Sequence, residues 1–378
     1  MSKNPFDEFS VSTPTDASLD DVVLDEPLGM KVGNKFPTLT GFPYKLAIIG
    51  EAPGKDEEVE GIPFVGMSGK LLTGMLAKAG VVREACFIGN VCQYRPFNNN
   101  ITNLEWDSEA MQEGITMLLA DLATFKPNLV FCLGGTSLHL LKAGNVAPPK
   151  RKTPKGYVYK FPNPIGKWRG SLFQSHLGYK CLSSYHPAAC TRMYQWTAYL
   201  WFDIIRCLKE ATTPILTLPQ RDLKVDLTYE ELLYELEQTN AKSEIISVDI
   251  EGGIGSMSCC SIANSSGHSF IVPFSNINVS SFWSEEQEIE VWRAFIKVMT
   301  NPNVPKILQN GLYDRFVLAY SYHILVRGCI DDTMLKFDEW LCELRKGLAV
   351  QASILTTEPY WKGDRLHAEE ADADEESE

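Results

Sequence analysis

Hydrophobic residues in the first half of the chain form short runs that alternate with helical patterns. Apolar runs of the length of buried strands lie at 45–50, 85–90, 128–134 and 179–184. Helical spacing marks the segments between and after them, at 69–79, 108–125, 137–143 and 191–210. This alternation predicts an α/β domain in which helices cover a parallel sheet. Ligands of such sheets lie beyond the carboxyl ends of the strands.

The second half of the chain has a different order of elements. Residues 212–220 carry two prolines and little periodicity, which is typical of a linker. A helical stretch at 229–239 follows, and then come apolar runs separated by short turns at 244–250, 255–262 and 268–273. Short turns predict an antiparallel meander. With helical patterns at 285–299 and 313–322 and no internal repeat, a second domain with a mixed α/β sheet is predicted.

These patterns divide the chain of 378 residues into five parts. The expected boundaries are an acidic leader, a first domain, a linker, a second domain and an acidic tail, at 1–30, 31–211, 212–222, 223–368 and 369–378.

The formal net charge of -13 is concentrated at the two ends. The leader has seven acids against Lys3, and the tail has seven acids and no base, so the body between them is formally neutral. The overall acidity therefore does not exclude a nucleic-acid partner, whose phosphates attract Lys and Arg. Both ends have the composition of disordered, solubilising segments, and docking of a partner or mimicry of DNA is the alternative.

Apolar runs and cysteines indicate an intracellular protein. No apolar run approaches the roughly 20 residues needed to cross a bilayer, and the N-terminus lacks the pattern of a signal peptide. The ten cysteines are scattered without zinc-type spacing. We therefore expect reduced thiols, a cytoplasmic location and no membrane partner.

Four motifs follow the predicted strands of the first domain. They read Gly50-Glu-Ala-Pro-Gly54 with its continuation to Leu72, Asn90-Val-Cys-Gln-Tyr-Arg-Pro96, Trp168-Arg-Gly170 and Tyr185-His-Pro-Ala188 with its continuation to Arg192. In this order they resemble the signature of the family 4 uracil-DNA glycosylases and their superfamily. The resemblance covers about the first 210 residues and implies a parallel-sheet α/β/α domain that acts on uracil in DNA.

Recognition of an extruded base explains part of this pattern. An enzyme that works on a base in DNA must extrude it and read its Watson–Crick edge. Phe64 is placed to stack on uracil, and the amide of Asn90 can donate to O4 while it accepts from N3–H, a pairing that cytosine would reverse. Gly50 permits close approach of the backbone. We also expect Ala52 and Arg192 to contact the substrate.

Cleavage of the N-glycosidic bond explains the remaining residue types. Negative charge grows on uracil O2, where an imidazole donor such as His186 stabilises it. The sugar becomes positively charged, so a carboxylate that orients water is useful. By its position in the motif Glu57 is the first candidate and Glu51 the second.

A basic segment and one missing cysteine complete the analysis of the first domain. Between Gly144 and Gly170 seven Lys and Arg residues, Lys167 and Arg169 among them, alternate with aromatic residues and no acid, which suits a DNA backbone or a solvated loop. Family 4 members typically hold an iron-sulfur cluster through four cysteines. Tyr94 stands where one of them is expected, and no cysteine precedes Cys86, so we predict no cluster.

Carboxylates dominate the motifs of the second domain. Asp249 and Glu251 lie two apart on a predicted strand, so both point to one face, and Asn310 and Asp314 follow in a second motif. This order resembles the 3'-5' proofreading exonuclease domain of family A DNA polymerases, which implies a ribonuclease H-like (DnaQ-like) fold. It also implies that Asp249, Glu251 and Asp314 bind Mg²⁺ or Mn²⁺. Asp332 matches an element near that site.

A third exonuclease motif requires a Tyr and an Asp four residues apart. Tyr360 and Asp364 have that spacing and are the candidates for substrate and metal binding. However, the segment 353–362 also resembles one that precedes the third motif in phage-type polymerases. Either Tyr360 and Asp364 take the place of the third motif, or the domain lacks the fourth carboxylate of the metal site.

Together the two resemblances imply a DNA-processing enzyme that combines uracil excision with 3'-5' exonuclease activity. This order of domains resembles the front half of some bacteriophage replicative polymerases, which suggests a separately encoded polymerase subunit as partner and an infected bacterial cell as the location. The expected substrates are uracil-containing DNA, single strands and primer 3' ends. The alternative is a non-catalytic uracil-reading and scaffold module of a polymerase holoenzyme.

Overall fold

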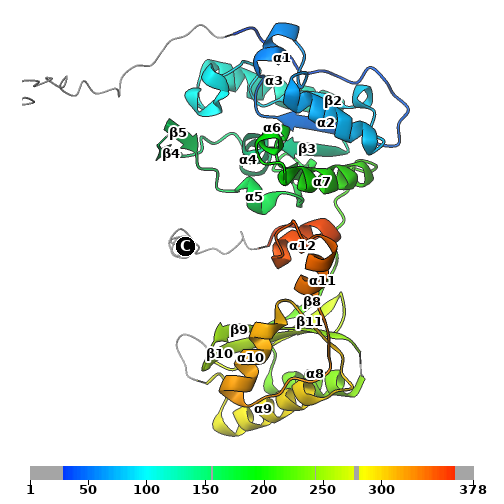
Figure 1. Cartoon of the computed structure of the whole chain (residues 1–378), viewed down its shortest axis with the longest axis vertical. Coiled ribbons are helices and arrows are strands. Elements are labelled where there is room, and N and C mark those ends of the chain that lie inside the picture. The colour runs from blue at the N-terminus through cyan, green and yellow to red at the C-terminus, as the bar shows by residue number, and fades with distance from the viewer. Residues whose placement is uncertain (1–28, 155, 243, 276–280, 362–378) are drawn as a thin grey trace, which may run out of the picture.

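The computed structural model describes residues 29–154, 156–242, 244–275 and 281–361 and contains two α/β domains (Figure 1). Asp364 and most of both acidic ends lie outside these residues. Within them, no helix is long and apolar enough to span a bilayer.

A five-stranded sheet forms the centre of the first domain, in the order β2-β1-β3-β7-β6. Its strands are β1 (Leu46–Gly50), β2 (Phe87–Asn90), β3 (Leu129–Leu133), β6 (Leu172–Gln174) and β7 (Lys180–Ser184). The first four in the order are parallel, as predicted, whereas the edge strand β6 runs antiparallel to β7.

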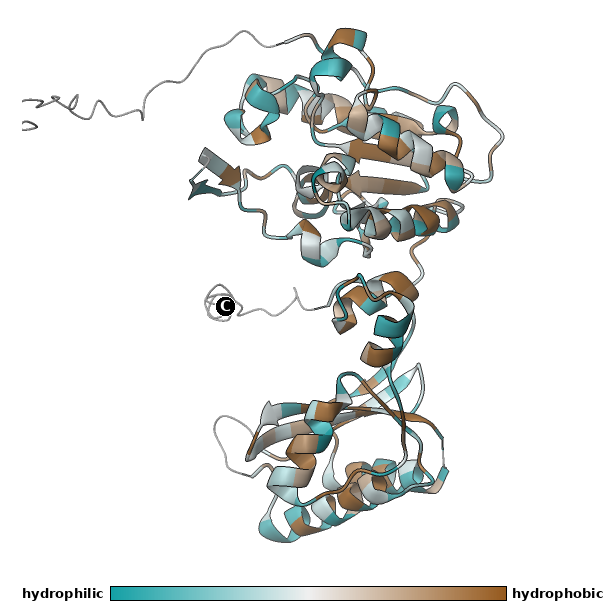
Figure 2. Ribbon diagram, in the orientation of Figure 1, coloured by the Kyte–Doolittle hydropathy of each residue, from teal (hydrophilic) through white to brown (hydrophobic). Residues whose placement is uncertain are grey.

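Helices cover both faces of this sheet because its strands are apolar on both sides. Leu46 and Ile48 face one layer, and Ala47 and Ile49 face the other. The first layer contains α2 (Met67–Lys78), α6 (Pro187–Arg192) and α7 (Trp196–Glu210), and the second contains α3 (Glu109–Phe125) and α4 (Gly135–Ala143). The brown strands between these helices in Figure 2 reflect this continuous hydrophobic run.

Two details of the first domain differ from the predicted elements. In place of the single helix expected at 191–210, the chain forms α6, which ends at Arg192, and α7, which begins at Trp196. The helix α6 starts before the expected range because His186 caps it and Pro187 is its first residue. The basic segment expected as a loop contains a hairpin and a short helix. These are β4 (Lys150–Thr153), β5 (Gly156–Tyr159) and α5 (Ile165–Trp168).

The second domain contains a six-stranded mixed sheet in the order β13-β12-β9-β10-β11-β8. Its strands are β8 (Asp222–Lys224), β9 (Ile246–Gly253), β10 (Ser256–Ala263), β11 (His268–Pro273), β12 (Lys306–Leu308) and β13 (Cys329–Asp332). The antiparallel meander β9-β10-β11 is confirmed. The short strands β8, β12 and β13 extend it and escape prediction because they offer too few residues for a pattern.

Helices cover this second sheet on one face. Side chains Ile246, Val248 and Ile250 alternate along β9 and point into a core shared with α8 (Tyr229–Lys242), α9 (Glu285–Thr300) and α10 (Gly311–Tyr322). The intervening side chains, including Asp249 and Glu251, are exposed. The strand therefore has one buried face and one face open to a substrate.

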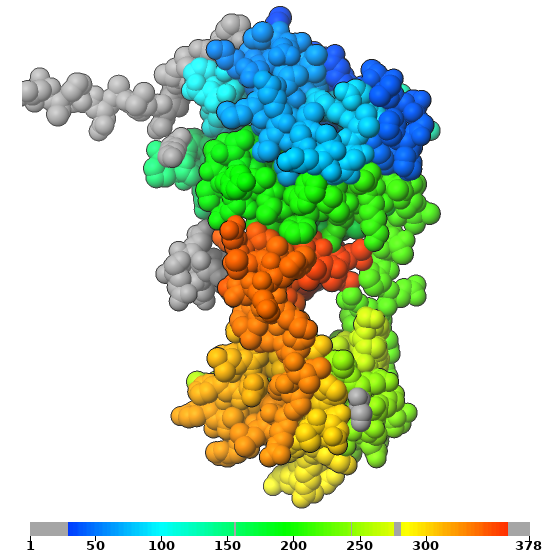
Figure 3. Space-filling model, turned by 45° about the vertical axis from the view of Figure 1, so that its right-hand side comes forward, coloured from blue at the N-terminus to red at the C-terminus, as the bar shows by residue number. Residues whose placement is uncertain are grey.

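The last described segment returns from the second domain to the first. It contains α11 (Thr333–Trp340) and α12 (Leu348–Leu355), and Figure 3 shows it directly against the first domain. Phe337 and Leu344 pack with Tyr199 of α7, and Ser353 accepts a hydrogen bond from Arg169 at 2.9 Å. The segment therefore joins the two domains through packed side chains, although the predicted boundaries assign it to the second domain alone.

We expect Tyr360→Ala to lower the free energy of unfolding of the first domain by about 3 kcal/mol, because the ring is buried in that domain's core. Tyr360 is 8% exposed and lies edge-on to Trp168, with ring centroids 5.6 Å apart. Denaturant unfolding followed by fluorescence measures the change. Tyr320→Ala is the matched control, since Tyr320 is 65% exposed. Equal losses from both substitutions would contradict the packing described.

Candidate functional site

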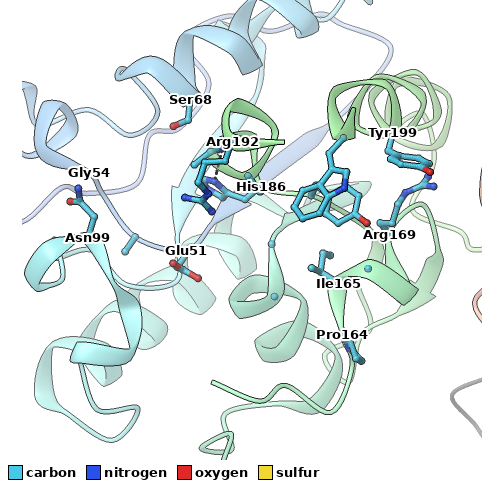
Figure 4. Close-up of a pocket in the computed structure, with 18 of the residues that line it drawn as sticks. Glu51, Gly54, Ser68, Asn99, Pro164, Ile165, Arg169, His186, Arg192 and Tyr199 are labelled. Atoms are coloured by element: carbon cyan, nitrogen blue, oxygen red, sulfur yellow. Dashed lines mark hydrogen bonds between the residues drawn. The ribbon is translucent and has the colours of Figure 1, made fainter. Parts of the chain in front are cut away.

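A cavity of about 1030 Å³ opens at the carboxyl ends of the first domain's strands. The four predicted motifs meet there, since the residues that line it include Glu51, Phe64, Asn90, Arg169, His186 and Arg192. Figure 4 shows Glu51, His186 and Arg192 toward the middle of this cavity. Residues far apart in the sequence thus converge where a parallel sheet places its ligands.

Gly50 allows two of these side chains to meet over the backbone. A Cβ atom at this position would lie 2.5 Å from Asn90 Oδ1 and 2.5 Å from Phe64 Cζ. Both distances are far shorter than van der Waals contact. No other residue therefore fits at the end of β1 without displacing the amide or the ring.

Phe64 adopts a backbone conformation that L-residues rarely occupy. Its φ is +56°, and its side chain is buried. The ring is stacked near His186, with centroids 5.6 Å apart and planes inclined by 28°. Strain of this kind costs about 1–3 kcal/mol and persists where the surroundings fix it, often at ligand sites.

Asn90 is buried at the end of β2 with an unpaired acceptor. Its Oδ1 atom has no hydrogen-bond partner among the described residues. Leaving a buried acceptor unpaired costs roughly 1–3 kcal/mol. A ligand with an N–H donor at this position would recover that free energy.

His186 combines a helix cap with an electrically neutral imidazole. Its Nδ1 atom accepts a hydrogen bond from the Ala188 amide at 3.2 Å, so the proton of the neutral ring sits on Nε2. Burial lowers the pKa of His186 to about 4, and the positive charge of Arg192 adds to the decrease. At neutral pH the ring is therefore an uncharged donor through Nε2.

The two candidate carboxylates have different surroundings. Glu57 accepts hydrogen bonds from the amides of Gly54, Val65 and Gly66 at 2.8–3.1 Å, and so folds the loop over the cavity. Glu51 accepts a hydrogen bond from Thr136 Oγ1 at 2.5 Å. Burial raises the pKa of Glu51, although Thr136 and the charge of Arg192 oppose that rise. Glu57 thus serves the loop, and Glu51 has an oxygen atom left for a ligand.

Two residues of the basic segment have structural partners instead of an exposed position. Arg169 is 3% exposed and pairs with Asp203, with Nη2 and Oδ1 2.5 Å apart. Lys150 pairs with Glu105 at 2.6 Å. Within the basic segment, Arg169 is thus neutralised by a buried carboxylate and does not present its charge to solvent.

Tyr94 occupies a structural position in the first domain. Its hydroxyl donates to Glu113 at 2.7 Å, and Lys31 donates to the other oxygen of the same carboxylate at 2.5 Å. The tyrosine ring packs on the core beneath. The absence of an iron-sulfur cluster remains a prediction from the sequence.

Three carboxylates of the second domain lie around β9. Asp249 and Glu251 stand on its exposed face, while Asp314 is buried at the strand's edge. On that side, the register of β12 with β9 covers Ile246 and Ser247 and does not extend to Ile250. The Ile250 amide instead donates a hydrogen bond to Asp314 Oδ1 at 3.2 Å. Burial raises the pKa of Asp314, the Ile250 hydrogen bond opposes this rise, and the charge of Asp332 adds to it.

These carboxylates do not converge on one point. The described residues include no group of three or more His, Cys, Asp and Glu side chains that could hold a metal ion. Asp314 is bound through one carboxylate oxygen to the amide of Ile250, the residue between Asp249 and Glu251. The predicted three-carboxylate metal site is not assembled in this structure.

Asn310 and Asp332 shape the turn before α10. Asn310 has a φ of +56°, and its amide donates to Asp332 Oδ1 at 3.2 Å. Asp332 also accepts from the amides of Gly311 and Met334, so it fixes the starts of α10 and α11. Their described contacts are therefore those of a helix cap.

The structure contradicts the predicted role of Tyr360 in the second domain's site. Its ring lies in the core of the first domain, and its amide donates to Ser171 Oγ at 3.1 Å. Asp364 lies outside the described residues. The spacing of Tyr360 and Asp364 fits the third motif, but tertiary packing carries Tyr360 to the other domain.

Sequence reasoning missed residues that the last segment adds to the cavity. Glu343, Arg345 and Val350 line it although they follow the last strand of the second sheet in the sequence. Thr136, which holds Glu51, was also missed. A signal for Thr136 existed in its position just after β3, whereas nothing local marks Arg345.

Comparison with known families gives two matches, one for each domain. The model of the uracil DNA glycosylase superfamily matches residues 40–205, and that of a 3'-5' exonuclease family matches residues 225–355. A type-4 uracil-DNA glycosylase of Archaeoglobus fulgidus is 32% identical over 157 residues, which are 41% of this chain and 71% of that protein. A type-4 uracil-DNA glycosylase of Thermotoga maritima is 30% identical over 148 residues, 39% of this chain and 67% of that protein.

Two solved structures illustrate the similarity of part of the chain to known folds. The EXD2 exonuclease domain soaked in Mg has 17% identity and a TM-score of 0.23, and the match covers 35% of this chain and 69% of that one. The catalytic core of RRP6 from Trypanosoma brucei has 16% identity and a TM-score of 0.25, with 38% of this chain and 42% of that one covered.

We expect His186 to titrate near pH 4 in the folded protein, below the ordinary histidine value of 6.5, because burial disfavours its charged form. NMR of the imidazole protons measures this midpoint. Between pH 6.5 and 4 the unfolded chain binds the proton first, so the free energy of unfolding should fall as the pH falls through this window. His186→Gln should remove that part of the pH dependence. A midpoint near 6.5 would contradict the buried, neutral ring.

Proposed function

Because the chain belongs to the uracil-DNA glycosylase superfamily and carries a 3'-5' exonuclease domain after that region, we propose that it hydrolyses the N-glycosidic bond of uracil in DNA. The observation that carries this proposal is the buried Oδ1 of Asn90, which lacks a partner among the described residues and lies beside Phe64. A flipped uracil would satisfy it.

Asn90 and Phe64 would recognise the base. The ring of Phe64 offers a stacking surface, and Oδ1 of Asn90 accepts from N3–H while its Nδ2 donates to O4. Cytosine presents an acceptor at N3 and a donor at the exocyclic amine, so both contacts would be mismatched. Unpaired buried groups of this kind give strong discrimination.

His186 would stabilise the leaving base. When the bond between C1' and N1 breaks, its electron pair stays with uracil, and negative charge develops at O2. The neutral imidazole donates to O2 through Nε2–H, which acts as a fixed dipole in a site shielded from water. Water then adds to C1' of the positively charged sugar and loses a proton.

Glu51 is the better candidate for orienting that water. The oxygens of Glu57 accept hydrogen bonds from three backbone amides, whereas Glu51 lines the cavity with one oxygen bound to Thr136. A carboxylate near C1' also offsets the charge of the sugar. We therefore assign the catalytic carboxylate to Glu51 and loop folding to Glu57.

The purified chain should release uracil from single-stranded DNA and leave abasic sites that alkali cleaves. His186→Ala should lower the rate by about 10²–10³-fold, as is typical for the loss of one donor to a developing anion. Gel analysis of a labelled, uracil-containing strand after alkali measures the rate. Binding of uracil DNA without cleavage would support the alternative, a uracil-reading scaffold module.

A matched pair of substitutions separates the two carboxylates in the same assay. Glu51→Gln should reduce kcat with little change in the melting temperature, because it removes only a charge facing the cavity. Glu57→Gln should lower the melting temperature, since the amide can accept at only one of its two former oxygen positions. The reverse pattern would return the catalytic role to Glu57.

For the second domain we propose 3'-5' exonuclease activity that depends on Mg²⁺ or Mn²⁺. The proposal rests on the family match and on Asp249 and Glu251, two hard oxygen donors on one exposed face. Asp314 is hydrogen-bonded to the Ile250 amide, so the described side chains do not by themselves fit a metal ion held by all three. A degenerate, non-catalytic exonuclease fold that acts as a scaffold is the second candidate.

Removal of metal separates these two candidates. We expect the full chain to shorten a 5'-labelled primer in Mg²⁺ and to stop in EDTA. Asp249→Ala should slow it by about 100-fold or more, because metal-assisted catalysis supplies several kcal/mol. Asp338→Ala is a control on α11, where Asp338 forms an ion pair with Lys346. Equal rates in Mg²⁺ and EDTA would favour the scaffold.

We also propose that the protein serves phage-type DNA replication or repair in the cytoplasm, beside a separately encoded polymerase. Removal of uracil and removal of a primer 3' end are both ways to correct a newly made strand. All ten cysteines are unpaired, which suits a reducing compartment. Co-purification with a polymerase that lacks its own exonuclease would support this role.

A further inference from the structure

The cavity extends well beyond the place for one base. Asn90, Phe64 and His186 surround one part of it, and Ile165, Tyr199 and Val350 line another. Figure 4 shows Tyr199, Arg169, Ile165 and Pro164 on the side opposite Gly54, Ser68 and Asn99. A cavity of about 1030 Å³ is at the upper limit of the sites that hold whole small molecules, so it has room for more than a pyrimidine.

The far side of the cavity is built by both domains. Leu344 is buried among Tyr199 and Phe337, and the Arg345 amide donates to the Tyr199 hydroxyl at 3.0 Å. Val350 packs on the same cluster. The segment 333–361, which follows the second sheet, is therefore anchored at the edge of the base pocket.

Three of the cations that line this cavity lie outside the ion pairs formed among the described residues. Lys167 of α5, Arg192 of α6 and Arg345 form no ion pair with any described carboxylate. The Arg345 side chain is exposed. Its charge also acts on Tyr185, which lines the same cavity. Burial raises the pKa of Tyr185, and the positive charges of Arg169 and Arg345 oppose that rise.

A strand with an extruded base brings phosphates to this position. Each internal nucleotide lies between two phosphates, and extrusion rotates that nucleotide about its backbone into the pocket. Phosphates that contact Arg release counterions, which makes affinity depend on salt. An unpaired guanidinium is well suited to such a contact because it offers a planar set of donors.

We propose that Arg345 binds a backbone phosphate of the strand that carries the extruded base, so that the segment 333–361, which follows the second sheet, completes the DNA-binding surface of the first domain. This proposal rests on the proposed uracil excision. It makes Arg345 a positioning residue for the substrate. The first domain alone would lack this contact.

Binding of a uracil-containing single strand to the full chain, measured at several salt concentrations, tests the proposal. Arg345→Gln should weaken binding several-fold and reduce the slope of log K against log [salt] by about 0.7, the value for one phosphate contact of a single strand. The loss in excision should fall mainly on KM. Arg345→Lys should restore most of the salt slope, since a cation returns.

Two further variants give the comparison its controls. Arg293→Gln removes a cation from the exposed surface of α9, where Arg293 pairs with Glu290, and should leave the salt slope unchanged. Glu343→Gln removes an acid from the cavity lining and should tighten binding. If Arg345→Gln matches Arg293→Gln in salt slope, the proposal is wrong. Binding is measured separately from excision. A chain that binds the strand without excising uracil would therefore overturn the proposed uracil excision, but not the proposed phosphate contact of Arg345.

Discussion

The buried ion pair of Arg169 and Asp203 ties together the parts that form the base pocket. Asp203 of α7 holds the guanidinium with both oxygens and also accepts from Ser184 at the end of β7. Arg169 reaches Ser353 of α12 with a further nitrogen. Removing one partner of a fully buried pair typically costs about 3–5 kcal/mol, because the other charge is left unpaired. The strand end that leads to His186 and the segment that joins the domains thus depend on one contact.

Much of the fold follows from local patterns in the sequence. The strands of the first sheet are continuous apolar runs, and β9 alternates Ile246, Val248 and Ile250 with polar residues, so both the fully buried and the half-exposed strand are legible. Residues at strand ends, such as Asn90 and His186, could be assigned to a site because parallel strands end at one edge. Here the sequence and the structure agree on which residues meet.

Other features depend on contacts between distant segments. Tyr360 has the spacing of an exonuclease motif, but spacing does not tell which hydrophobic core will take up the ring. Glu51 and Glu57 stand in one motif, and only the folded loop shows that three amides converge on Glu57. The helix α12 is apolar on most sides and has no distinct polar face. Its sequence pattern therefore does not indicate that it packs between two domains.

The return of the chain to the first domain has a consequence for its synthesis on the ribosome. Residues 31–211 emerge first, yet Ser353 and Tyr360, which contribute to that domain's interior, are translated only after all six strands of the second sheet. The interior of the first domain is therefore completed only late in translation. A ribosome that stalls between the domains would leave the apolar surface around Trp168 exposed to chaperones.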